Sequence, residues 1–265
     1  MYPRSDLEGI LRPIPRHVLA GGLPPVSEEQ CKGGVWFLPS RNRADRARDC
    51  MEACVKAGQT TQGVLIQDGC DYITLQPPWT SPWQKIKLDA QHELAGALQK
   101  GWKRYPRKLW YGIISDGVRP ITPGWDRLLL AASQGKNFVS CSDNGWREDT
   151  RMAGILLVPG WIIEAMRYWF PEGMIHLYTD DVWEQIAGAL GNWVYAEDVV
   201  VTDNHHSHPD PANRTTFDHP RIFKGKPYAD SDRDLFNDWR YGPEFAETID
   251  RIKRVWWTIT GEAWE

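Results

Sequence analysis

The chain has 265 residues, of which 42% are hydrophobic and 25% are charged. These proportions are typical of a soluble globular protein and exclude a disordered chain, a collagen-like repeat and a coiled coil. Lys and Arg number 31 against 35 Asp and Glu, which leaves a formal net charge of −4. This balance argues against a protein that binds nucleic acid mainly through non-specific charge.

The cysteines and the apolar runs indicate a cytoplasmic protein without a membrane partner. There are five cysteines, an odd number, and they form no Cys-x-x-Cys pair, which fits a reducing compartment better than a disulfide framework. The N-terminal residues lack the charged, apolar and small-residue pattern of a signal peptide. The longest apolar run, Ile155–Ile163, is interrupted by Pro159-Gly160 and is too short to span a bilayer.

Tryptophan is in marked excess, with 15 residues. Each indole has a flat apolar face and one N–H donor, so the excess suits a protein that stacks on sugars or bases. A tryptophan-rich core accounts for the same count equally well.

The first predicted elements form a βαβ unit. Residues 1–33 contain many Pro and Gly and predict an irregular N-terminal arm. Apolar runs predict buried strands at 35–38 and 63–67, and helical spacing predicts a helix over 47–55 between them. A strand, a helix and a strand within so few residues imply parallel strand pairing.

The rest of the chain continues this alternation. We therefore expect an α/β sandwich with a mostly parallel central sheet, formed by a single domain over residues 34–265. Ligands in such sheets bind beyond the carboxyl ends of the strands. The further predicted helices are 86–98, 126–132, 161–169, 183–190 and an amphipathic C-terminal helix that includes Phe245 and Trp256; the further predicted strands are 109–114, 137–141, 155–158 and 193–201.

Polar residues follow the first two strands. Ser40, Arg41 and Arg43 come after the first strand and before a helix, where an arginine pair suits a phosphate. Asp68 follows the second strand, where a carboxylate accepts hydrogen bonds from a ribose or from a base N–H. A solvated helix start and a simple turn before Gly69 are the alternatives.

Three more groups suit metal binding or proton transfer. Asp116 follows the central strand and is placed to hold a hard metal that carries phosphates, or else it forms a turn. His206 and His208 lie in a His-rich segment and share one side if that segment is extended; the alternative is an exposed loop. Asp180 and Asp181 open a helix, either as capping residues or with one of them as a general base.

A basic run covers residues 100–108, with Trp102 and Tyr105 among its positive charges. It suits a phosphate backbone through charge and stacking. A solvated helix end explains it as well.

Taken in order, these segments resemble the GT-A-type nucleotide-sugar glycosyltransferases, in particular the compact phage and bacterial members of their large inverting family. The resemblance covers about residues 35–220 and is strongest at WYGIISDGVRPITPGWDRLLLAA. Other matching segments are VWFLPSRNRADRARDCMEAC, GVLIQDG, KLDAQHELAGALQKGW and TDDVWEQIAGALGNWVYAEDVVVTDNHHSHP. The family's acidic pair is reduced here to Asp116 followed by Gly117, so one metal-binding carboxylate is missing.

The resemblance implies a metal-assisted, inverting transfer from a nucleotide-diphospho-sugar, expected as a UDP-sugar, with Mn²⁺ or Mg²⁺. It implies that Asp181, with Asp180 as the alternative, is the base, and that Asp116 binds metal together with His206 or His208. Arg119 is expected at the donor phosphates as well.

The acceptor stays open among a hydroxymethylated pyrimidine in DNA, a saccharide and a protein. If the chain is phage-encoded, the expected location is the cytoplasm of a bacterial host. The competing functions are a metal-dependent hydrolase or nuclease that uses the His and Asp residues, and a non-catalytic carbohydrate or nucleic-acid binder.

Overall fold

A computed structural model describes residues 16–17, 25–41, 43–69, 81–142, 154–203 and 228–264. Its strands join into one nine-stranded sheet in the order β1-β9-β7-β8-β5-β2-β3-β4, with the short β6 paired to β9. The strands are β1 (Arg16–His17), β2 (Gly34–Ser40), β3 (Gly63–Gln67), β4 (Trp83–Lys87), β5 (Trp110–Ile114), β6 (Val118–Pro120), β7 (Phe138–Ser142), β8 (Ile155–Pro159) and β9 (Trp193–Asp203).

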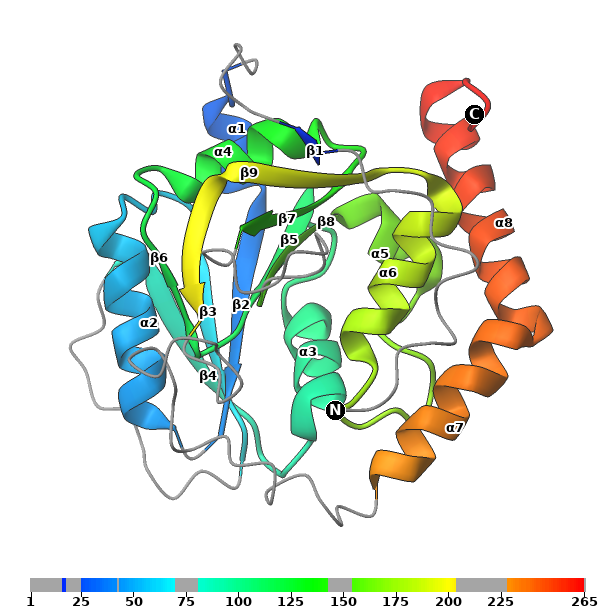
Figure 1. The fold of residues 1–265 in the computed structure, drawn as a ribbon, viewed down its shortest axis with the longest axis horizontal. Helices are drawn as coiled ribbons and strands as arrows, with labels where there is room; N and C mark the ends of the chain where they lie inside the picture. Colours follow the sequence, from blue (N-terminus) through cyan, green and yellow to red (C-terminus); the bar gives the residue numbers. More distant parts are fainter. Residues whose placement is uncertain are drawn as a thin grey trace.

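The sheet is mostly parallel, as the sequence predicts. Strands β2, β3, β4 and β5 pair in parallel, and so do β7 and β9. Strand β8 runs antiparallel to both of its neighbours, β5 and β7. Because β2 to β5 share one direction, their carboxyl ends lie together at one edge of the sheet, which is the lower end in Figure 1.

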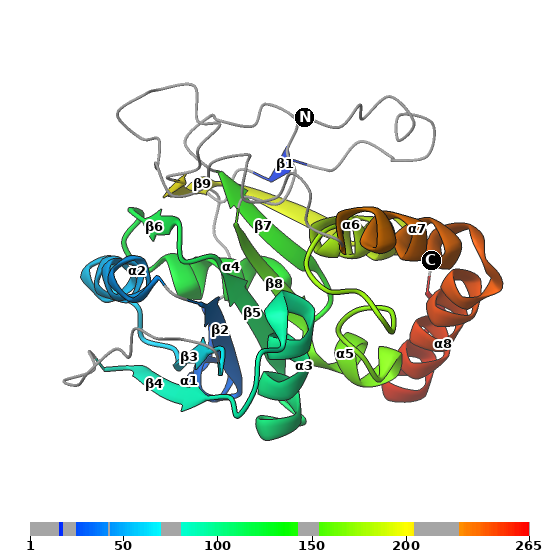
Figure 2. The ribbon, with the colours of Figure 1, turned by 90° about the horizontal axis from the view of Figure 1, so that it is seen from below.

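Helices cover both faces of the sheet (Figure 2). On one face α3 and α5 contact the central strands, α6 packs against β7 through Trp183 and Phe138, and α7 and α8 pack further out; on the other face lie α2 and α4. The helices are α1 (Glu28–Lys32), α2 (Ala44–Lys56), α3 (Glu93–Arg104), α4 (Trp125–Ser133), α5 (Gly160–Met166), α6 (Thr179–Leu190), α7 (Tyr228–Tyr241) and α8 (Pro243–Thr260).

Each central strand supplies side chains to two cores. In β2, Val35 and Phe37 join the core under α3 and α5, whereas Trp36 and Leu38 join the core under α2 and α4. All four side chains are fully buried. A continuous apolar run is therefore what a strand covered on both faces requires.

Glycines opposite tryptophans allow the large rings to lie flat on the sheet. Gly112 of β5 pairs with Trp36 of β2, and a Cβ atom at Gly112 would lie 1.9 Å from that indole. Gly34 makes room for Trp110 in the same strand pair. Any larger residue at these glycines would force the core apart.

Most of the tryptophan excess belongs to the core. This finding favours the packing interpretation over the expectation that tryptophans stack on ligands. The buried tryptophans among the described residues are Trp36, Trp83, Trp110, Trp125, Trp169, Trp183, Trp193 and Trp239.

Several elements differ from the sequence prediction, and the short strand β6 was not predicted. Ile86 lies in the edge strand β4, so the helix predicted from residue 86 is wrong at its start; α3 begins at Glu93. The arm expected to be irregular contains α1 and the two-residue β1. Helix α7, from Tyr228 to Tyr241, was not predicted, although its partner α8 was.

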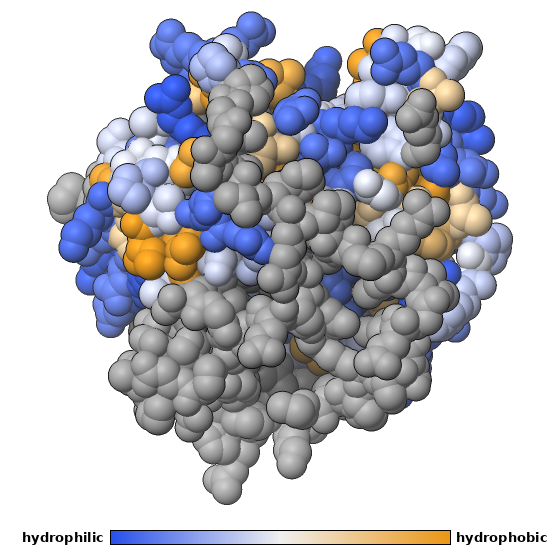
Figure 3. Space-filling view, turned by 45° about the horizontal axis from the view of Figure 1, so that its top comes forward, coloured by the Kyte–Doolittle hydropathy of each residue, from blue (hydrophilic) through white to orange (hydrophobic). Residues whose placement is uncertain are grey.

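The described helices offer no membrane-spanning segment, since none combines sufficient length with sufficient apolar character. The coloured surface in Figure 3 is largely hydrophilic, with small separate hydrophobic patches.

Candidate functional site

Three predicted site residues meet where β2 and β5 end. The Ser40 hydroxyl donates a hydrogen bond to Oδ2 of Asp116 over 2.9 Å. Nη1 of Arg43 lies 3.1 Å from Oδ1 of the same carboxylate. Parallel pairing of β2 with β5 brings these residues together although they lie 73 and 76 positions apart in the chain.

The Asp116 carboxylate is almost completely buried, with a relative exposure of 4%. A buried charge needs a partner of opposite charge and hydrogen-bond donors. Arg43 and Ser40 supply both. Arg43 itself keeps 29% of its side chain accessible, so a cation stands at the surface of the site.

A second cluster forms where β3 ends and α3 begins. Asp68, which is 3% exposed, accepts hydrogen bonds from the backbone N–H groups of His92 and Glu93 over 3.0 and 3.2 Å. The Glu93 carboxylate forms an ion pair with Nη1 of Arg41, which also lies 3.9 Å from Asp68. Both oxygens of Asp68 therefore hold the start of α3 in place.

Glu93 has an unusual backbone conformation. Its φ of +54° lies in the left-handed region, which residues with a side chain rarely adopt. Burial would raise the pKa of Glu93, but the hydrogen bond and charge of Arg41 outweigh it, so the pKa is lowered. A strained, ionised residue held beside a cation is a feature of binding sites.

A buried carboxylate on α7 organises the neighbouring loop. Asp232 is fully buried and accepts hydrogen bonds from the backbone N–H groups of residues 175, 176 and 177 over 2.8–2.9 Å. The carbonyl of Ile175 in turn accepts from the N–H of Ala95 in α3. Asp232 thus fixes His176 next to the start of α3.

His176 and Tyr228 complete this second cluster. Their rings lie 6.1 Å apart between centroids. Burial lowers the pKa of His176, and the charges of Arg43 and Arg41 lower it further, whereas Glu93 and Asp232 oppose the shift. Burial likewise raises the pKa of Tyr228. The sequence did not predict Glu93, His176, Tyr228 and Asp232 as site residues, because only folding brings them together.

The two candidate bases, Asp180 and Asp181, lie in the first turn of α6 and are half-buried. The loop that Asp232 holds leads directly into this turn. The N-terminal end of a helix favours negative charge. In Figure 1 the first turns of α3, α6 and α7 all lie toward the end of the molecule at which β2 and β3 finish.

Arg119 has a role in holding the chain together. Its guanidinium donates to the backbone carbonyls of Asp116, Val118 and Arg46 and lies 3.6 Å from Asp49. These contacts tie the turn after β5 to α2. Arg43, and not Arg119, contacts the side-chain carboxylate of Asp116.

The basic run 100–108 lies away from this site. It forms the C-terminal end of α3 and the following loop, whereas Glu93 and the site lie at the N-terminal end of the helix. Trp102 donates its indole N–H to Glu164, and Tyr105 donates its hydroxyl to Gln84. Both rings pack against the core, so the expected stacking on bases does not fit them.

The proposed metal ligands are only partly described. His206 and His208 lie outside the described residues. Within the part of the chain that the structure covers, no three His, Cys, Asp or Glu side chains gather closely enough to hold a metal ion. Asp116 lies just beyond the carboxyl end of β5, where the sequence placed it. A complete metal site would need ligands from beyond these residues.

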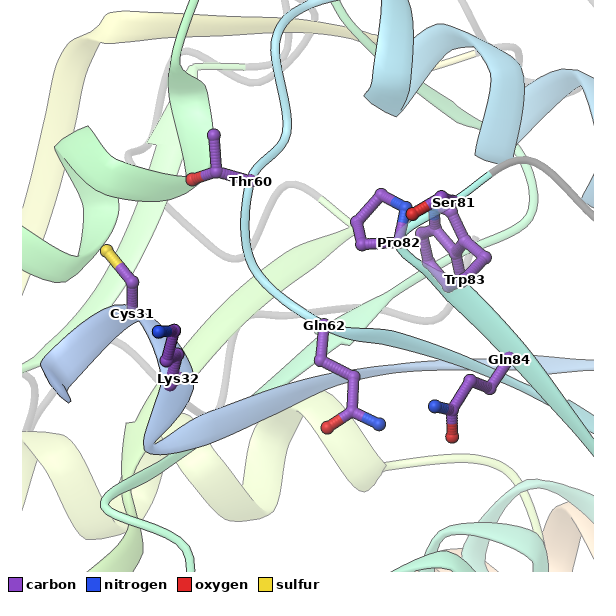
Figure 4. A pocket seen from close by; sticks show the side chains of 8 residues that line it. All are labelled: Cys31, Lys32, Thr60, Gln62, Ser81, Pro82, Trp83 and Gln84. Carbon is purple, nitrogen blue, oxygen red and sulfur yellow. The ribbon is translucent and has the colours of Figure 1, made fainter. Parts of the chain in front are cut away.

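A cavity of about 450 Å³ lies at the opposite, amino-terminal edge of the sheet (Figure 4). Its lining includes Lys32 of α1, Gln62 before β3 and Trp83 at the start of β4. The described lining offers no carboxylate for metal or proton chemistry. The polar clusters at the carboxyl edge are therefore the better candidate site.

Comparison with solved structures identifies the fold. The chain is similar to GalNAc-T7, solved with UDP, GalNAc and Mn²⁺, with a TM-score of 0.58 and 10% identity over 83% of this chain. It is also similar to the glucosyl-3-phosphoglycerate synthase of Mycobacterium tuberculosis, solved with Mn²⁺, UDP and phosphoglyceric acid, with a TM-score of 0.55 and 11% identity over 87% of each chain.

A third similar structure is the mannosyltransferase PcManGT of Pyrobaculum calidifontis, solved with GDP-Man and Mn²⁺. Its TM-score is 0.52, with 10% identity over 92% of this chain and 81% of that one. The chain spans 50% of the length of the GalNAc-T7 structure. No protein-family model and no curated protein matches the sequence. The chain has the GT-A glycosyltransferase fold, as the sequence resemblance implies.

Proposed function

We propose that this protein is a glycosyltransferase that moves a sugar from a nucleotide-diphospho-sugar to an acceptor hydroxyl with inversion. The observation that carries the proposal is the contact of Ser40 and Arg43 with Asp116 at the carboxyl edge of a GT-A fold. In open α/β sheets this edge is where ligands bind. The similar structures, solved with nucleotide sugars or their nucleotides, support the same assignment.

The donor diphosphate is proposed to bind beside Arg43 at the start of α2. Arg43 directly precedes this helix, so its guanidinium and the backbone N–H groups at the helix N-terminus can both bind phosphate oxygens. Asp116, with His206 or His208, would hold a divalent metal, which supplies positive charge to the diphosphate when bound. Arg41 lies at the same edge, paired with Glu93, and is proposed to lie near the base of the donor.

The reaction needs one base. In the proposed step the Asp181 carboxylate takes the proton of the acceptor hydroxyl, and that oxygen forms a bond to the anomeric carbon of the sugar. The bond between this carbon and the phosphate oxygen breaks, and the nucleoside diphosphate leaves with the electron pair. One displacement inverts the anomeric configuration. Asp180 is the alternative base.

The acceptor is proposed to be the hydroxyl of a saccharide. The DNA acceptor considered from the sequence depended on the basic run 100–108 and its aromatic residues. Those residues lie at the far end of α3 from Glu93, and their aromatic rings are engaged in packing.

The test is a thermal-shift panel of nucleotide sugars with and without Mn²⁺, followed by assays of transfer to saccharides. A ligand that binds the folded state raises the apparent stability. Asp116→Asn should abolish the shift given by the true donor. Asp250→Asn, an exposed aspartate on α8, is the matched control and should preserve it. A full shift for Asp116→Asn would contradict the assignment of the donor site.

The hydrolase or nuclease alternative requires several acidic metal ligands close together, which the described residues do not provide. A non-catalytic binder would show the thermal shift without turnover. Release of nucleoside diphosphate that depends on an acceptor separates transfer from both alternatives.

A further inference from the structure

The ion pair between Arg41 and Glu93 lies at the carboxyl edge of the sheet. It places a group that accepts hydrogen bonds beside a group that donates them. Arg41 lies just beyond β2, and Glu93 is the first residue of α3, 52 positions later. Their side chains remain 28% and 18% accessible. A ligand bound at this edge can therefore reach both groups.

Glu93 is the more available of the two carboxylates: its Oε1 accepts hydrogen bonds from Arg41 and Gln91, and 18% of its side chain stays accessible. Each oxygen of Asp68 already accepts a backbone N–H, and the side chain is only 5% accessible. Those two hydrogen bonds hold the start of α3, including the left-handed backbone of Glu93. The buried carboxylate of Asp68 thus positions the more accessible carboxylate of Glu93.

The chemistry of the pair fits one kind of nucleobase edge. A carboxylate offers two acceptor oxygens, and a guanidinium offers only donors. Guanine presents two parallel donors, N1–H and the N2 amino group, beside the acceptor O6. Glu93 can accept both donors while Arg41 donates to O6.

Other bases fit this pair less well. Uracil presents one N–H between two carbonyl oxygens, so a carboxylate that accepts this N–H places its second oxygen against a carbonyl. Cytosine and adenine present a single amino donor on this edge, and so use one carboxylate oxygen.

We propose that Arg41 and Glu93 select a guanosine-diphospho-sugar as the donor, in place of the UDP-sugar expected from the sequence. The inference rests on the proposed glycosyltransferase function and adds the base of the donor to it. A good bidentate contact to a base gives about 1–3 kcal/mol of discrimination, or roughly five- to 150-fold in affinity.

The test is a calorimetric titration of the full chain with GDP, UDP, CDP and ADP in the presence of Mn²⁺. We expect the affinity for GDP to exceed that for each other nucleotide at least about tenfold, within the range for one bidentate contact. Glu93→Gln replaces one acceptor oxygen with an amide donor. It should lower the affinity for GDP by a similar factor and leave the affinity for UDP unchanged or raised.

Two further variants make the experiment specific. Glu247→Gln makes the same chemical change at an exposed position on α8 and should leave every affinity unchanged. Arg41→Lys keeps the charge but loses the planar fork, and should also reduce the preference for GDP. Thermal unfolding of each variant shows whether the variant is folded, and therefore whether a loss of affinity comes from a loss of folding.

Three results would overturn the inference while leaving the proposed function intact: equal affinity for GDP and UDP, preference for another nucleotide, or a Glu93→Gln variant that still prefers GDP to the wild-type extent. If none of the four nucleoside diphosphates binds, the proposed function fails together with the inference.

Discussion

Arg43 and Asp116 form an ion pair in the first cluster of the candidate site, with 3.1 Å between Nη1 and Oδ1. The pair links the start of α2 to the turn after β5, and it leaves the guanidinium partly accessible beside a buried carboxylate. The Arg43 guanidinium can therefore neutralise the Asp116 carboxylate and bind a phosphate at the same time.

Replacing Arg43 with Ala should therefore weaken nucleoside diphosphate binding. Hydrogen bonds to charged groups contribute about 1.5–3 kcal/mol, so we expect a loss of roughly ten- to 150-fold in affinity, measured by calorimetry. Arg43→Lys should recover only part of this affinity because it lacks the bidentate fork. Arg48→Ala, an exposed arginine on the same helix, is the control. Equal affinities for wild type and Arg43→Ala would remove Arg43 from the donor site.

A second prediction concerns the buried carboxylate of Asp232. Asp232→Asn places an amide donor where the carboxylate accepts three backbone N–H groups. We expect this to lower the free energy of unfolding by about 2–4 kcal/mol, as measured by urea denaturation. The matched change at the exposed Asp234 should cost less than about 0.5 kcal/mol. Similar losses for the two variants would show that the three hydrogen bonds do not stabilise the loop.

The pKa of His176 predicts a dependence of stability on pH. Burial lowers this pKa from its usual 6.5, so the unfolded chain binds the proton more readily than the folded chain does. The free energy of unfolding should fall as the pH drops from 6.5 toward the lower pKa of the folded state. His176→Gln should make this fall shallower in urea denaturation at pH values of about 7.5 and 5.5. Equal slopes in wild type and variant would contradict this account of His176.

Sequence periodicity located most of the strands, and with them half of the site. Ser40, Asp68 and Asp116 each follow an apolar run, and parallel pairing then brings strand ends together. Helical spacing misled at Ile86, because the edge strand β4 has only Trp83 and Ile86 as buried residues and shows no clear alternation. The spacing of Ile86 from Ala90 and Leu94 fits a helix, which is why the predicted helix started too early.

The second cluster could not be predicted in the same way. Glu93 lies in a segment that predicts an ordinary helix, and His176 and Asp232 belong to no motif. Hydrogen bonds from Asp68 and Asp232 to distant backbone N–H groups place them, and these contacts span at least 24 positions. Hydrogen bonds between a side chain and a distant backbone N–H produce no periodic pattern in the sequence.

The last prediction concerns the base. Asp181→Asn should bind the nucleotide sugar with normal affinity, because the base acts on the acceptor and not on the donor. Transfer should nevertheless slow by about 10²–10⁴-fold, the usual effect of removing a general base. Asp180, its neighbour in the same first turn of α6, provides the matched variant. Donor affinity is measured by calorimetry and transfer by release of nucleoside diphosphate in the presence of acceptor. If Asp180→Asn is inactive and Asp181→Asn transfers at the wild-type rate, the two roles are exchanged. If both variants keep full activity, the base lies elsewhere, and the single-displacement mechanism loses the residue on which it depends.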